Sequence, residues 1–164
     1  MSQDPQIRIL HDHSHLMALL QDLDRALVIW SAADRISDEQ ESGSLPDIRE
    51  ILELLKDDTF EHFEREEHGL FPNLRESYPH LDEEIAGLHR AHDEICEAIE
   101  ALERQLQTAK DGLPESRARA VAAGQRLGQL YWSHTAVEWE MIRNLLDQLD
   151  ERQRAVIVEQ LKEI

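Results

Sequence analysis

One pattern of histidine and glutamate occurs twice along this chain, and its residue types are those that bind metal ions. A single histidine precedes His-x-x-x-Glu on the next predicted helix. The two copies comprise His13, His62 and Glu66, and then His92, His134 and Glu138. Residues four apart on a helix lie on one face about one turn apart, so each His-x-x-x-Glu directs an imidazole and a carboxylate toward a shared volume. Mixed imidazole and carboxylate ligands suit iron, manganese or zinc better than calcium or magnesium.

The spacing alone is weak evidence, because the chain contains 35 Asp and Glu residues. The same spacing in His80 and Glu84 is interpreted as an accident of composition. What distinguishes the repeated pattern is its position on the helices, which therefore have to be located first.

Nearly the whole chain is predicted to be helical, with breaks at 31–47, 71–80 and 107–114. These segments are rich in Gly, Pro, Ser or Asp, which favour turns over helix interiors. Pro5 and Pro46 fit the first position of a helix, and Pro72 should end or kink the second helix. The predicted helices lie near 5–33, 46–71, 81–108 and 114–149, with a short fifth at 151–163 capped by Asp150.

Connections of these lengths suit an antiparallel up-down-up-down four-helix bundle. The predicted fold class is therefore all-α. Residues 1–164 are expected to form a single domain, with 151–164 as a short C-terminal helix packed on the bundle. Gly124 and Gly128, inside the fourth long helix, suggest close approach of a neighbouring helix.

Each long helix carries a stripe of apolar residues with a spacing of three or four, which is typical of a face turned to the core. The first stripe is Ile9, His13, Leu16, Leu20, Leu23, Leu27 and Trp30. The second, less regular, is Ile48, Leu52, Leu55, Thr59, His62, Glu66 and then Gly69 or Leu70. The third is Ile85, Leu88, His92, Ile95, Ile99, Leu102 and Leu106. The fourth is Leu127, Tyr131, His134, Glu138, Met141 and Leu145.

The repeated pattern thus interrupts all four stripes with residues that are costly to bury. A buried carboxylate should lose its charge or find a cation, and no basic residue shares the stripe of Glu66 or of Glu138. A common metal site accounts for the whole set. Six protein ligands exceed what one tetrahedral zinc ion needs, and two carboxylates can bridge a pair of ions.

Four segments resemble the hemerythrin family, also called the HHE cation-binding domain. They are DHSHLMALLQDL (12–23), HFEREEHGLFPNL (62–74), RAHDEICEAIEAL (90–102) and HTAVE (134–138), and the likeness covers about residues 8–148. The resemblance implies a four-helix bundle that holds two Fe ions in a non-haem centre bridged by two carboxylates and an oxo or hydroxo group. It implies His13, His62, His92 and His134 as terminal ligands, with Glu66 and Glu138 as the bridges.

The sequence departs from the oxygen-carrying hemerythrins in its third helix, where those proteins have His-x-x-x-His. Here the neighbouring histidine is His89, three residues before His92 and off the stripe, which disfavours reversible oxygen carriage. His89, and also His11 and His15, remain candidates for an additional ligand. Tyr131 either packs in the core or lies beside a bound ligand. Glu67 could replace Glu66 only if the helix register shifted.

The function implied by the resemblance is binding of, or reaction with, a small ligand such as O2, H2O2 or NO. Whether the protein is an enzyme stays open, since a di-iron site could instead have peroxidase-like or catalase-like activity. Iron storage or delivery is a further alternative, and a structural zinc bundle is another.

Charge and composition limit the remaining partners. The net charge of −18 disfavours nucleic acid and anionic membrane surfaces. The N-terminal residues show no secretory signal, and the single cysteine, Cys96, excludes an intramolecular disulfide framework. A cytoplasmic protein is expected, as a monomer or a homodimer.

Overall fold

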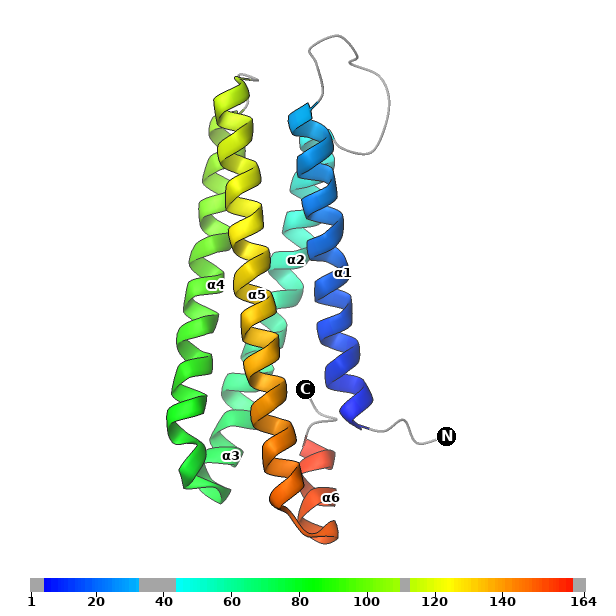
Figure 1. Ribbon diagram of the computed structural model, residues 1–164, viewed down its shortest axis with the longest axis vertical. Coiled ribbons are helices and arrows are strands. Elements are labelled where there is room, and N and C mark those ends of the chain that lie inside the picture. Colours follow the sequence, from blue (N-terminus) through cyan, green and yellow to red (C-terminus); the bar gives the residue numbers. More distant parts are fainter. Residues whose placement is uncertain (1–4, 33–43, 110–112, 161–164) are drawn as a thin grey trace.

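Four long helices form the body of the protein, which is described here from a computed structural model. The structure describes residues 5–32, 44–109 and 113–160, and side chains from His13 to Glu159 within these ranges. The helices are α1 (Pro5–Ala32), α2 (Leu45–Arg65), α4 (Asp82–Thr108) and α5 (Pro114–Gln148). They run up, down, up and down, as Figure 1 shows. No β-strand occurs in the described ranges, and the predicted all-α bundle is confirmed.

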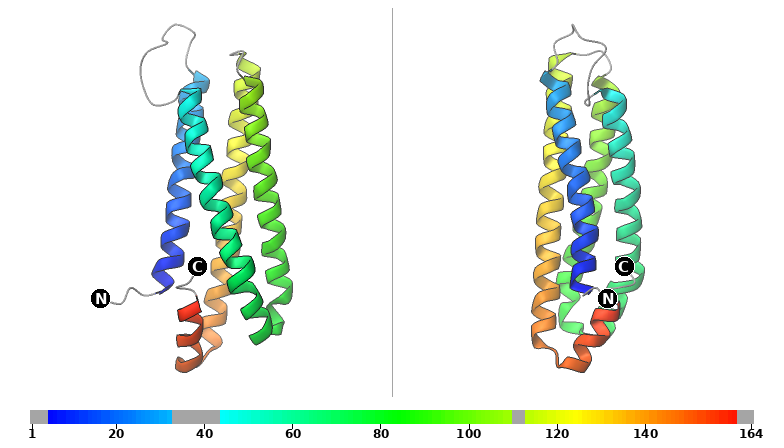
Figure 2. Two further views of the ribbon diagram at one scale, coloured as in Figure 1. Left: turned by 180° about the vertical axis from the view of Figure 1, so that it is seen from behind. Right: turned by 90° about the vertical axis from the view of Figure 1, so that its right-hand side faces the viewer.

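The packing order closes the bundle into a square. α1 packs against α2 and α5, and α4 packs against α5 and α2. The short helix α6 (Glu151–Gln160) follows α5 and contacts α1 at the end of the bundle where α1 begins (Figure 2). No described helix is long and apolar enough to cross a membrane.

Pro72 does not end the second helical segment, although a break was predicted there. α2 continues through a π-helical turn, η1 (Glu66–Leu70), into α3 (Phe71–Ser77). Within this turn the N–H group of Phe71 donates to the carbonyl of Glu66, five residues back. The helix thus gains one residue per turn just before a proline that has no N–H group to donate. The chain reverses only after Ser77, through the 3-10 turn η2 (Pro79–Leu81).

Side chains cap two of the helices. The Ser44 hydroxyl accepts a hydrogen bond from the N–H group of Asp47, whose carboxylate accepts one from the N–H group of Ser44. At α6, the carboxylate of Asp150 accepts from the N–H group of Gln153 at 2.8 Å, as predicted for an N-cap. Such caps satisfy the free N–H groups of a first helical turn.

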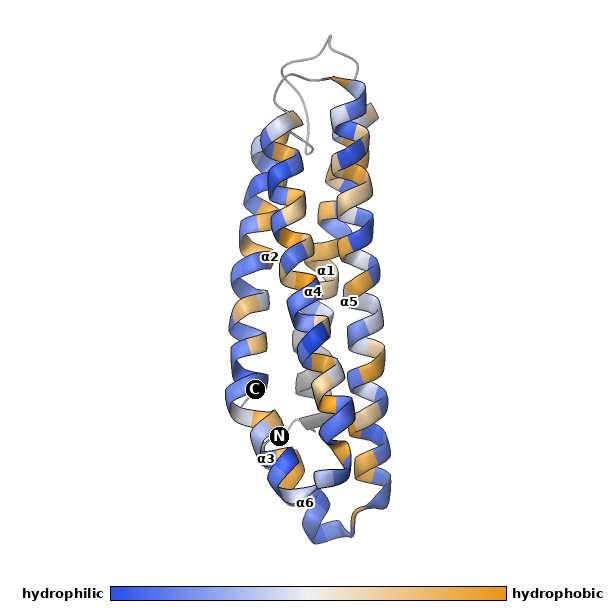
Figure 3. Cartoon of the chain, turned by 90° about the vertical axis from the view of Figure 1, so that its left-hand side faces the viewer, coloured by the Kyte–Doolittle hydropathy of each residue, from blue (hydrophilic) through white to orange (hydrophobic). Residues whose placement is uncertain are grey.

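The predicted stripes face the interior. Every stripe residue whose side chain is described is buried except Gly69, the second helix using Leu70 instead. The side chain of Ile9 lies outside the described part. Figure 3 shows hydrophobic and hydrophilic residues alternating along each helix, as expected for helices with one buried face.

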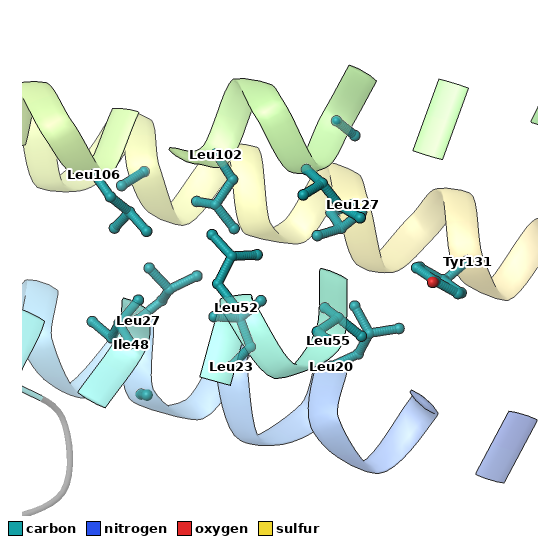
Figure 4. Packing of buried hydrophobic residues seen from close by; sticks show 14 of the residues in the cluster. Leu20, Leu23, Leu27, Ile48, Leu52, Leu55, Leu102, Leu106, Leu127 and Tyr131 are labelled. Carbon is teal, nitrogen blue, oxygen red and sulfur yellow. The ribbon is translucent and has the colours of Figure 1, made fainter. Parts of the chain in front are cut away.

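The apolar core consists of two clusters rather than one. The larger lies among all four long helices, and Figure 4 shows leucine and isoleucine side chains from opposite helices meeting there, with Tyr131 at one end. The smaller is built from η1, α3, η2, α4, α5 and α6, and includes Phe71, Leu88 and Ile157. Along α4 and α5 the residues of the repeated pattern fall between the two clusters, and in α1 His13 lies at the edge of the larger one. His62 adjoins Phe63 of the larger cluster, and Glu66 lies between Phe63 and Leu70 of the smaller one.

The two glycines of α5 differ in their surroundings. A Cβ atom at Gly124 would lie 2.4 Å from Cδ1 of Leu27, whereas a Cβ atom at Gly128 would meet nothing within 4 Å. The expectation of close helix approach is therefore confirmed at Gly124 only.

Gly124→Ala and Gly128→Ala should change stability in opposite directions. Alanine at 128 adds helix propensity without a clash, so the free energy of unfolding should rise by about 0.5–1 kcal/mol. Alanine at 124 must displace the fully buried Leu27 side chain, and overpacking of about 1–3 kcal/mol should exceed the propensity gain. Urea unfolding followed by circular dichroism measures both. An equal gain in stability for the two variants would contradict the close approach of α1 and α5.

Candidate metal centre

The repeated histidine and glutamate residues form one buried layer across the bundle. α1 contributes one histidine, α2 another, α4 a third, and α5 a histidine with a glutamate one turn later. Glu66 is the first residue of η1. The layer consists of His13, His62, Glu66, His92, His134 and Glu138, each no more than 5% exposed. The structure therefore brings together the six residues of the repeated pattern.

Two of the histidines meet on the side of α1 and α2. Nε2 of His13 lies 3.0 Å from Nε2 of His62 and 3.1 Å from Oε2 of Glu138. The same glutamate oxygen lies 3.7 Å from Nε2 of His134, so Glu138 faces histidines from two helices.

Glu66 connects the two halves of the layer. Its Oε1 atom lies 3.0 Å from Nε2 of His62, and its Oε2 atom lies 3.1 Å from Nε2 of His92. The rings of His92 and His134 are neighbours, with centroids 4.8 Å apart. One carboxylate thus presents a different oxygen to each side.

The arrangement fits a metal centre because several buried polar atoms are otherwise unsatisfied. Within the described structure, both oxygens of Glu66, both oxygens of Glu138 and both ring nitrogens of His134 have no partner in hydrogen-bonding geometry. Burying such atoms without partners is costly, and a cation would satisfy them. Three groups of described residues place ligand atoms within 4.8 Å of one another. Two are fully buried: His13, His62, His134 and Glu138, and Glu66, His92 and His134. The third, Glu67, His89 and His92, is only partly buried.

The protonation states of the two carboxylates differ because their surroundings differ. Burial would raise the pKa of Glu66, but the imidazoles of His62 and His92 outweigh it and hold this pKa well below its ordinary value. Burial raises the pKa of Glu138, and the negative charge of Glu66 raises it further. Two buried carboxylates in one layer therefore do not ionise equally without a cation.

The histidines also differ. Burial lowers the pKa of His134 to about 3, with the nearby His92 and His13 adding to the effect, so this imidazole is neutral at pH 7. Burial lowers the pKa of His92, but the carboxylates of Glu66 and Glu67 outweigh it and raise the pKa above its ordinary value. A neutral imidazole such as His134 is the form that binds a metal ion.

A glutamate that sequence reasoning set aside, Glu67, joins the edge of the site. Its Oε1 atom lies 2.6 Å from Nδ1 of His92 and 3.4 Å from Nδ1 of His89. The helix register does change here, through the π-helical turn, but Glu66 stays buried in the layer and Glu67 supplements it rather than replacing it. The signal in the sequence was the pair of consecutive glutamates, Glu66 and Glu67, less than two helical turns before Pro72.

Of the other candidates, His15 and His89 are not part of the buried layer, although His89 approaches His92, and Tyr131 borders the layer. His15 is exposed and pairs with Asp58 at 3.0 Å, and His89 is half-buried beside Glu67. The side chain of His11 lies outside the described part. Tyr131 is buried next to the layer, and its hydroxyl makes a hydrogen bond with the Thr59 hydroxyl.

Aromatic rings line the layer on the side of α4. The Phe63 ring stacks on His92 with centroids 3.7 Å apart and an interplanar angle of 7°, and it meets His134 edge-on at 5.6 Å. The Phe71 ring lies nearly parallel to His92 at 5.7 Å. These contacts keep the surroundings of the imidazoles apolar.

Comparison with known proteins agrees with this geometry. The family model of the hemerythrin HHE cation-binding domain matches residues 4–146, a span that includes all six residues of the layer. No curated protein and no solved structure matches the chain. With the model covering most of the chain and its buried histidines and glutamates brought together, the protein belongs to the hemerythrin HHE cation-binding domain family.

Proposed function

We propose that the buried layer holds two iron ions and that the protein binds or reacts with a small ligand such as O2, H2O2 or NO. The observation that carries this proposal is the position of Glu66, whose two oxygens face histidines on opposite sides of the layer at 3.0 and 3.1 Å. A carboxylate in this position is suited to bridge two cations.

The ligands divide between the two ions by proximity. His13 and His62 would hold one ion, since their Nε2 atoms are 3.0 Å apart. His92 and His134, whose rings are neighbours, would hold the other. Glu66 would contribute to both ions, and Glu138 would be the second shared ligand because it approaches both His13 and His134.

Two iron ions held by these residues would supply a change of oxidation state between ferrous and ferric and a coordination position for a small ligand. The protein's own residues orient the imidazoles and keep water out. The apolar clusters that adjoin the layer provide this exclusion, with Phe63 closest to the imidazoles. The hydroxyls of Tyr131 and Thr59 form a hydrogen bond with each other, so neither needs a partner in the metal layer.

Turnover of peroxide and handling of iron are rival uses of the same site. Metal quantification, with an absorption spectrum recorded before and after reduced, iron-loaded protein meets oxygen, tests the proposal. Steady-state consumption of peroxide would favour an enzyme, whereas a stable spectral change without turnover supports ligand binding. Zinc as the only bound metal, with no iron-dependent absorption after iron loading, would contradict the proposal.

His62→Ala and Glu138→Ala should each abolish stoichiometric binding of two metal ions. Both variants remove a buried ligand atom from the group of His13, His62, His134 and Glu138. His80→Ala provides a control because His80 is exposed. Elemental analysis after iron loading gives the stoichiometry, and circular dichroism checks folding. The ligand assignment is wrong if both folded variants still hold two irons.

The stability of the metal-free protein should depend on pH through His134. Its pKa is about 3 when folded and near 6.5 when unfolded, so between these values only the unfolded chain gains the proton. The free energy of unfolding should therefore fall as the pH drops below 6.5. The effect of this one group is about 1 kcal/mol between pH 6.5 and 5.5.

His134→Gln should remove that dependence, because glutamine does not titrate. Urea unfolding of both metal-free proteins at pH 6.5 and 5.5 measures the difference, and contributions of other groups largely cancel in the comparison. Equal pH slopes for the wild type and the variant would show that His134 is not held neutral by burial.

A further inference from the structure

We propose that Glu67 is a positioning residue for the metal centre: it accepts a hydrogen bond from the Nδ1–H group of His92 and so directs Nε2 of that ring into the layer. The consequence is that the two metal positions are unequal, with the one served by His92 binding its ion more tightly. This inference rests on the proposed two-metal centre and adds to it a residue outside the set of six.

The contacts of His92 carry the proposal. Oε1 of Glu67 lies 2.6 Å from Nδ1, while Oε2 of Glu66 lies 3.1 Å from Nε2 on the other edge of the ring. An ionised carboxylate only accepts hydrogen bonds, so Nδ1 must be the protonated nitrogen that donates to Glu67. Nε2 is thereby left as the metal-binding atom, which is the usual pairing for a histidine ligand oriented by a carboxylate.

Other histidines of the layer lack this support. Nδ1 of His62 and Nδ1 of His134 have no hydrogen-bond partner within the described residues. Their polar neighbours in the layer all face Nε2, whereas the ring of His92 is also held at Nδ1 by a carboxylate acceptor. Because an acceptor of this kind fixes the tautomer and raises ligand basicity, His92 should be the stronger ligand.

The π-helical turn explains how two consecutive glutamates reach the same ring. Consecutive residues of an α-helix point about 100° apart, which would carry Glu67 away from a ring that Glu66 contacts. The wider turn at η1 brings both carboxylates to α4. His89 lies one turn before His92, and its Nδ1 atom is 3.4 Å from the same oxygen of Glu67. This contact restrains the partly exposed side chain of Glu67.

Titration of metal-free protein with Co2+ tests the inequality. The wild type should bind two ions in two steps, and Glu67→Ala should weaken one step about 10-fold to 100-fold while leaving the other unchanged. Glu67→Gln keeps an acceptor oxygen, so its loss of Co2+ affinity at that step should be smaller than that of Glu67→Ala. Glu64→Gln serves as the matched control, because it removes one exposed carboxylate charge from the same helical segment.

A second measurement needs no metal. In 15N-labelled metal-free protein, the ring Nδ1–H proton of His92, assigned by its loss in His92→Gln, should resonate far downfield and be protected from exchange. Glu67→Ala should remove the downfield shift and protection, Glu67→Gln should reduce them, and Glu64→Gln should leave them unchanged.

The outcomes separate the two proposals. If the wild type binds fewer than two Co2+ ions, the two-metal function fails, and the resonance of His92 still decides whether Glu67 positions the ring. If the wild type binds two ions and Glu67→Ala binds them with the same two affinities, the positioning role is overturned although the metal centre stands. A resonance unaffected by Glu67→Ala overturns it as well.

Discussion

Burial of four imidazoles and two carboxylates in one layer is the constraint on which the rest of this structure depends. The carboxylate oxygens have no hydrogen-bonding partner among the described residues, so the layer is unfavourable unless a cation satisfies it. That requirement demands a rigid frame on all four sides. The long helices supply it, because each one contributes a histidine and packs against two neighbours. The opposite pKa shifts of Glu66 and Glu138 have the same origin, because two buried carboxylates in one layer do not both keep a negative charge easily without a cation.

The local irregularities of the chain are explained by the same layer. The π-helical turn occurs at Glu66, where α2 passes from the larger apolar cluster to the smaller one. It allows Glu66 to reach two helices and brings Glu67 against His92. It also replaces Gly69 by Leu70 on the buried face, so the smaller cluster begins directly beyond the metal layer. A regular α-helix through this segment would serve one of these purposes but not all of them.

Much of this could be predicted from the sequence, because the strongest signals are periodic. Apolar stripes with a spacing of three or four located the helices and placed His13, His92 and the two His-x-x-x-Glu pairs on buried faces. The π-helical turn could not be predicted, since periodicity assumes one register throughout and Pro72 allowed either a break or a kink. The role of Glu67 depended on that turn and was missed for the same reason. Gly124 and Gly128 look alike in sequence, and only the position of Leu27 separates them.

The division of the apolar core has a consequence for how the molecule opens. The smaller cluster is formed mainly by short elements, η1, α3, η2 and α6, together with the ends of α4 and α5. Short segments with few apolar contacts are the ones that open locally at low free-energy cost. We therefore expect two cooperative units joined at the layer. A bound cation would act as a cross-link between them, so that exchange of backbone amides in α3, η2 and α6 reports the occupancy of a site to which these three elements contribute no ligand.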